Sequence, residues 1–92
     1  MNKQKLPLDC AVLKYFTTVD EASAVEVMEA LKEEFSDYRP FTRKGIDEVL
    51  MTGVVNGMLV ETHYELESDG GLKVYYKADE EGRAIINKYL PD

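Results

Sequence analysis

The residues best suited to chemistry in this sequence are three cations near the middle of the chain. Arg39, Arg43 and Lys44 fall within six residues, in the segment RPFTRKGIDEVL. Cationic side chains contact DNA phosphates, and arginine can also read guanine through two hydrogen bonds. Asp47 and Glu48 follow at once, about one helical turn beyond the cations. The segment therefore suits either a DNA contact or a solvated helix face of paired charges.

No comparable set of residues suggests catalysis, a metal or a cofactor. Cys10 and His63 are the only cysteine and the only histidine, too few for a zinc cluster or a nucleophile with its base. Acids are abundant, but no pair stands out as a general acid and a general base. Gly70 and Gly71 form a turn and lack the lysine and hydroxyl residue that complete a phosphate loop. We therefore expect a protein that is not an enzyme and needs no cofactor or metal.

The composition is typical of one small globular domain covering residues 1–92. Hydrophobic residues make up 45% of the chain and charged residues 32%, which is too much apolar area for disorder. The net charge is −7, but residues 20–37 hold seven acids and one lysine, so most of the acidity lies outside the cationic segment. Neither a signal sequence nor a membrane span is recognisable, and we expect a cytoplasmic protein with no membrane partner.

Most of the first half of the chain has helical periodicity. Apolar residues spaced three and four apart predict amphipathic helices at about residues 8–17, 24–35 and 43–56. Ser23 and Glu26 have the spacing of a capping box before the second helix, and Thr42 can cap the third. Gly53 lies inside the third helix, where glycine costs about 0.5–1 kcal/mol relative to alanine. Close packing against a neighbouring backbone, or a kink, would explain its presence.

After Gly57 the apolar period changes to two, which predicts a β-hairpin. Its strands are expected at about residues 58–66 and 72–78, with Met58, Val60, Thr62, Tyr64 and Leu66 on one face. Asp79 can cap a last helix at about residues 80–90. The hairpin turn is acidic, and Lys73 is the cation nearest to it.

This order of elements and two local motifs resemble winged helix-turn-helix proteins, in particular PadR and MarR-like bacterial transcriptional regulators. Gly57 and the apolar residues after it match the passage from recognition helix to wing in those families. Tyr76, followed by Asp79 and the pair Gly82-Arg83, is similar to the end of their wing. The resemblance implies an α+β fold with a three-helix bundle that contains the helix-turn-helix, a two-stranded hairpin wing and a C-terminal helix.

The resemblance also implies that residues 43–56 enter the major groove of double-stranded DNA. The DNA-binding residues would then be Arg39, Thr42, Arg43, Lys44, Asp47 and Lys73. It implies a homodimer formed by the terminal helices, through Leu6, Leu8, Tyr15, Ile85, Tyr89 and Leu90. The alternative is a winged helix that contacts a protein partner through its acidic second helix or its wing and does not bind DNA.

Overall fold

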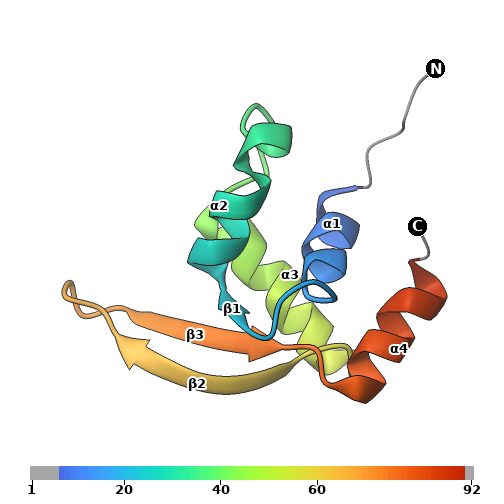
Figure 1. Cartoon of the computed structure of the whole chain (residues 1–92). Helices are drawn as coiled ribbons and strands as arrows, with labels where there is room; N and C mark the ends of the chain where they lie inside the picture. Colours follow the sequence, from blue (N-terminus) through green and yellow to red (C-terminus); the bar gives the residue numbers. More distant parts are fainter. Residues whose placement is uncertain (1–6, 91–92) are drawn as a thin grey trace.

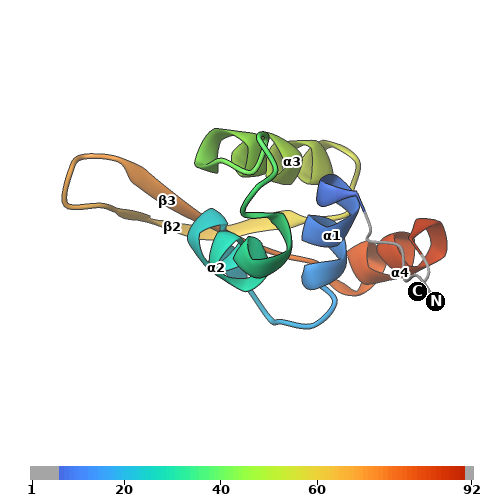
Figure 2. The same ribbon diagram turned by 90° about the horizontal axis from the view of Figure 1, so that it is seen from above.

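The computed structural model describes residues 7–90 as four helices and a three-stranded antiparallel sheet (Figure 1). The elements are α1 (Leu8–Tyr15), β1 (Ala22–Ser23), α2 (Ala24–Phe35), α3 (Arg43–Val55), β2 (Val60–Leu66), β3 (Leu72–Lys77) and α4 (Glu80–Tyr89). The first three helices form a bundle, the hairpin β2–β3 projects away from it, and α4 lies at the other end of the molecule (Figures 1 and 2). The α+β class expected from the sequence is confirmed. Across residues 7–90, no helix is long and apolar enough to cross a membrane.

The third strand, β1, was not predicted from the sequence. Ala22 and Ser23 pair with Tyr76 and Tyr75 of β3, which gives the strand order β1-β3-β2. Two residues are too few to show an alternating pattern. Ser23 also caps α2, and its capping box with Glu26 is formed as expected. This one residue therefore joins the sheet to the helical bundle.

A bulge in β2 changes the predicted alternation partway along the strand. Glu61 pairs with Tyr76 and His63 with Tyr75, so Thr62 is an extra residue between two registered pairs. An extra residue in one strand sends the following side chains to the other face of the sheet. The prediction of one continuous face along β2 is therefore wrong.

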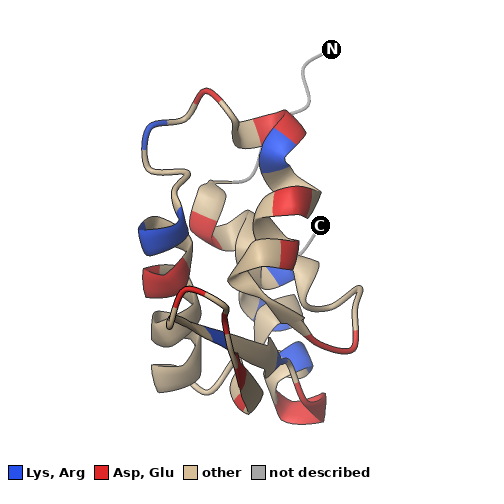
Figure 3. Ribbon diagram, turned by 90° about the vertical axis from the view of Figure 1, so that its left-hand side faces the viewer, with Lys and Arg blue, Asp and Glu red and all other residues tan. Residues whose placement is uncertain are grey.

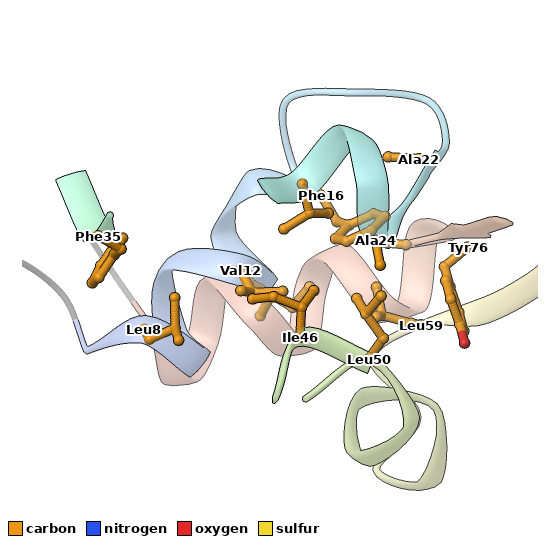
Figure 4. Packing of buried hydrophobic residues seen from close by; sticks show 13 residues of the cluster. Leu8, Val12, Phe16, Ala22, Ala24, Phe35, Ile46, Leu50, Leu59 and Tyr76 are labelled. Carbon is orange, nitrogen blue, oxygen red and sulfur yellow. The ribbon is translucent and has the colours of Figure 1, made fainter. Parts of the chain in front are cut away.

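The core fills the space between the helices and the base of the hairpin (Figure 4). The largest fully buried apolar side chains are Val12, Phe16, Val27, Ile46, Leu50, Leu59 and Ile86. Burying a side chain of this size stabilises a fold by about 1.5–3 kcal/mol. Ile46 and Leu50 both belong to α3, so burial fixes which side of this helix faces inward and leaves the opposite side for solvent.

Gly53 allows α3 to pack closely against α1 and the segment that enters β2. A Cβ atom at this position would lie 2.9 Å from Leu59 Cδ1 and 3.1 Å from Leu13 Cδ2. The Gly53 carbonyl accepts hydrogen bonds from the backbone N–H groups of Met58 and Leu59, at 2.9 and 3.2 Å. The close packing expected at this glycine is therefore made with leucine side chains rather than with a neighbouring backbone.

Gly82 and Arg83 hold α4 against the start and the end of the hairpin. A Cβ atom on Gly82 would lie 2.1 Å from the carbonyl oxygen of Met58. Arg83 Nε donates to the carbonyl of Ala78 at 3.0 Å, and its Nη2 donates to the carbonyl of Val19 at 3.1 Å. The Gly-Arg pair therefore has a structural role, because it fixes the angle at which the chain leaves the wing.

We predict that Gly82→Ala lowers the free energy of unfolding by about 1–3 kcal/mol, because the added methyl group must displace a backbone carbonyl. Urea denaturation measures this change. The matched control is the reverse substitution at the exposed Ala84 of the same helix. Ala84→Gly should lower the free energy of unfolding by about 1 kcal/mol, because glycine is less favourable than alanine in a helix. Without a clash, Gly82→Ala would raise the free energy of unfolding by the same amount. A Gly82→Ala variant as stable as the wild type would contradict the close contact.

Candidate nucleic-acid interface

The N-terminus of α3 is fixed by Thr42. Its hydroxyl oxygen accepts a hydrogen bond from the backbone N–H of Gly45 at 3.0 Å, so Thr42 is the helix cap expected from the sequence. Lys44 lies on the side of α3 opposite to Ile46 and Leu50, whereas Arg43 lies at the end of their stripe and is only partly exposed. The remaining free N–H groups and the helix dipole make this end favourable for an anion.

Arg43 turns from α3 toward the hairpin. Its Nη2 donates to the carbonyl of Leu72 at 3.3 Å and lies 3.8 Å from Glu67 Oε1. Its Nε lies 3.4 Å from Asp47 Oδ2 and is buried without a hydrogen-bond partner in residues 7–90. The pairing of Arg43 with Asp47 that the sequence offered as an alternative to DNA contact is therefore formed. In this arrangement Arg43 bridges α3 and the wing.

Lys44 and Arg39 are exposed, and neither forms an ion pair within the described part of the chain. The ion pair of Lys44 with Glu48 that the spacing allowed is absent there. Arg39 lies in the loop between α2 and α3, close in sequence to the helix cap. These two side chains are the cations that are available beside the N-terminus of α3.

Lys73 lies apart from the cations of α3. Along β3 its side chain is on the face opposite to Tyr76, whose ring is buried in the core. Its Nζ is 3.4 Å from Glu26 Oε2 and 5.2 Å from the centre of the Tyr75 ring. The structure therefore groups Thr42, Arg43 and Asp47 but places Lys73 on the other side of the wing.

The wing tip and the start of α3 together carry charges of both signs. Figure 3, which looks along the wing, shows acidic residues at the hairpin turn and both signs of charge on the first turns of α3. Partial burial raises the pKa of the Asp47 carboxyl, Arg43 opposes this rise, and Glu67 adds to it. The charge of Arg43 is thus shared between a carboxylate of α3 and one in the hairpin turn.

Sequence reasoning missed the row of side chains along the outermost side of α3. Lys44, Glu48, Met51 and Val55 are four, three and four residues apart, so they form one line, which we call the outer row of α3. All four are exposed, including Met51 at 60% and Val55 at 83%. Figure 2 shows α3 at one edge of the molecule, with the other elements on its inner side. The spacing could have revealed this row, because its two apolar members lie outside the buried stripe.

The tyrosines of the hairpin have different surroundings. Tyr76 is buried, and Tyr75 stacks on His63 with ring centres 4.4 Å apart. Tyr64 is 67% exposed and, beyond the bulge, pairs with Val74 on the face that also carries Tyr76. Two of the three side chains are therefore used in core or cross-strand packing.

Neither a protein-family model nor a curated protein sequence matches this chain. The crystal structure of Bacillus subtilis PadR in complex with operator DNA is similar over 92% of this chain, with a TM-score of 0.68 and 18% sequence identity. The fold is a winged helix. The matched part is 47% of the PadR chain, so this protein spans about half the length of PadR. In this fold α3 is the third helix of the bundle, and β2–β3 is the hairpin called the wing.

We predict that Asp47 in the folded protein titrates at a higher pH than in the urea-unfolded chain, because it is partly buried beside Glu67. The ¹³C chemical shift of the Asp47 carboxyl, followed from pH 7 to 3, gives the titration midpoint in the folded protein and in the urea-unfolded chain. Since the folded pKa is the higher one, the contribution of Asp47 to the free energy of unfolding should rise as the pH falls through it toward the unfolded value.

Arg43→Ala should raise the Asp47 midpoint further, because it removes the charge that opposes the rise. Lys44→Ala, which removes a cation without an ion pair in residues 7–90, should change this midpoint much less. A folded midpoint at or below the unfolded one, or equal effects of the two substitutions, would contradict the bridging role of Arg43.

Proposed function

We propose that this winged helix is a DNA-binding transcriptional regulator that places α3 in the major groove of double-stranded DNA. The observation that carries the proposal is the uncovered outer side of α3, which begins at a capped, cationic helix N-terminus. An α-helix fits the major groove, and such an end binds phosphate through its dipole and N–H groups. PadR, which has the same fold, has been crystallised with operator DNA. The single domain of residues 1–92 would act in the cytoplasm and would have no catalytic role.

In this proposal Arg39 and Lys44 contact phosphates flanking the groove, and Arg43 reads a guanine. Arg43 must first exchange its contacts with Glu67 and the Leu72 carbonyl for the base. Partly exposed ion pairs contribute about 0–1 kcal/mol, whereas a good bidentate contact to a base discriminates by about 1–3 kcal/mol. Giving up these contacts therefore costs no more than the discrimination that a base contact provides, and Asp47 can keep the guanidinium oriented throughout the exchange.

Thr42 and Lys73 have smaller parts in the proposal. Thr42 acts through the cap that shapes the helix N-terminus, since its hydroxyl oxygen accepts from Gly45. Lys73 can reach a phosphate only after leaving Glu26, so it would contribute from the far side of the wing. The DNA contact thus depends mainly on α3 and the loop before it.

We also propose that the regulator is a homodimer formed through α1 and α4. Tyr89 is 64% exposed on α4, and Tyr15, Ile85 and Leu90 are half-buried at the surface of the same end. Leu8 is only 7% exposed and belongs to the core, so it is not available for a dimer contact, and Leu6 lies outside the described residues. Each subunit would make few phosphate contacts, but a dimer would present two recognition helices and would double the total number of these contacts.

The wild-type protein should bind random 25-base-pair duplexes at tens of millimolar salt, with an affinity that falls as the salt concentration rises. The double variant Arg43→Ala/Lys44→Ala should bind at least tenfold more weakly and should depend less on salt, because two cations are lost from each subunit. Fluorescence anisotropy across a salt series measures both effects.

The matched control is Lys32→Ala/Lys77→Ala, which changes the net charge equally on α2 and at the base of the wing. It should bind nearly as well as the wild type. If the wild type does not bind DNA, or if the two double variants bind alike, α3 is not the DNA-contacting surface.

Sedimentation velocity at micromolar concentrations should show a dimer of the wild-type protein. Tyr89→Ala should shift the population toward monomer, because it removes the largest exposed apolar side chain of α4. The comparison is Tyr38→Ala, which removes a 50% exposed tyrosine from the loop before α3 and should leave the dimer intact. A wild-type protein that sediments only as a monomer would remove the dimer and would weaken the case for a two-site operator.

A further inference from the structure

The outer row of α3 ends in two apolar side chains that no other described element covers. Met51 is 60% exposed and Val55 is 83% exposed, and Figure 2 shows the rest of the fold on the inner side of the helix. Ile46 and Leu50 form the buried side of α3, so Met51 and Val55 are not part of the core. Isolated exposed apolar residues are common, but these two continue a line that starts with Lys44 at the cationic end of α3. They therefore lie where a groove-bound helix would meet base edges.

We propose that Met51 reads the C5 methyl group of thymine, an inference that rests on the proposed DNA binding through α3. Thymine presents this methyl group in the major groove, where apolar side chains can contact it. Methionine is long, flexible and polarizable, so its side chain can adjust its conformation to contact a small apolar group such as a methyl. Val55, one turn further along the row, would contact a flanking thymine.

The other members of the row indicate which bases accompany the thymine. Glu48 is exposed and can accept a hydrogen bond from the amino group of cytosine. Lys44 and Met51 are seven residues apart, which is about 10.5 Å along a helix axis. At about 3.4 Å per base pair, that distance covers roughly three base pairs. The recognised half-site would therefore contain a thymine about three base pairs from the Lys44 contact, with a cytosine between them.

Charge favours DNA over an apolar protein surface as the occupant of this row. The row begins at Lys44, which has no ion pair within the described residues, and at a helix N-terminus. A protein partner that buried Met51 and Val55 would also have to desolvate this charged end. A DNA groove instead supplies phosphates at its edges and methyl groups on its floor.

The test begins with duplexes selected from a randomised pool by the wild-type protein. Each thymine of a selected duplex is then replaced by deoxyuridine, which removes only the C5 methyl group and keeps the hydrogen-bonding edge. At one thymine per half-site, the affinity of the wild type should fall about fourfold, the effect of losing one methyl-sized apolar contact. Met51→Ala should bind the thymine and deoxyuridine duplexes equally.

Two further variants complete the design. Met51→Gln keeps the length of the side chain but ends in an amide, so it should also fail to distinguish the two bases. Val25→Ala removes a 41% exposed apolar side chain from α2 and should keep the fourfold discrimination. Urea denaturation of each variant verifies that the fold is intact.

The outcomes separate this inference from the proposed function. If no duplex is enriched or bound at low salt, DNA binding itself fails. If duplexes are selected but deoxyuridine costs nothing at any position, or if Met51→Ala keeps the discrimination, DNA binding stands and the methyl-reading role of Met51 is wrong.

Discussion

Burial of Ile46 and Leu50 is the constraint on which the arrangement of α3 depends. Both side chains are fully buried, and turning the helix to expose them would cost about 3–6 kcal/mol together. This cost is a large part of the free energy of unfolding of a domain of this size. The orientation of α3 is therefore set by the core, and the side chains of the outer row face solvent as a consequence. The packing of Gly53 against Leu13 and Leu59 fixes how deeply the helix sits.

The position of the wing relative to α3 depends on weaker interactions. The base of the hairpin is held by Tyr76 in the core and by the bulge at Thr62. Toward the tip, the described contacts with α3 are those of Arg43 with Glu67 and the Leu72 carbonyl. Partly exposed charge pairs of this kind contribute at most about 1 kcal/mol. The base of the wing is thus firmly packed, whereas its tip can separate from α3 at little cost and can adjust to a ligand.

Much of the helical part could be predicted from the sequence because its determinants are local. The capping box of Ser23 and Glu26 and the cap at Thr42 involve residues two or three apart, and the core stripe of α3 is periodic. The missed features depend on contacts between distant segments. Strand β1 exists because Tyr75 and Tyr76 lie beside it, and the bulge at Thr62 is defined only by the register against β3. The same limit applies to the candidate interface: the pairing of Arg43 with Asp47 follows from spacing, but its contact with the wing joins residues 29 positions apart.

The uneven charge of the chain determines which contacts would stabilise the proposed complex with DNA. With a net charge of −7, the protein repels a polyanion at long range, but charges separated by more than about 8–10 Å are largely screened at physiological salt. Few cations lie near α3, so the electrostatic attraction that gives strong binding to any DNA sequence is small. Contacts that depend on base identity, such as those of Arg43 and the outer row, would then supply a larger share of the binding free energy. If α3 binds DNA as proposed, its weakly cationic surface would favour discrimination between sequences over tight binding to all of them.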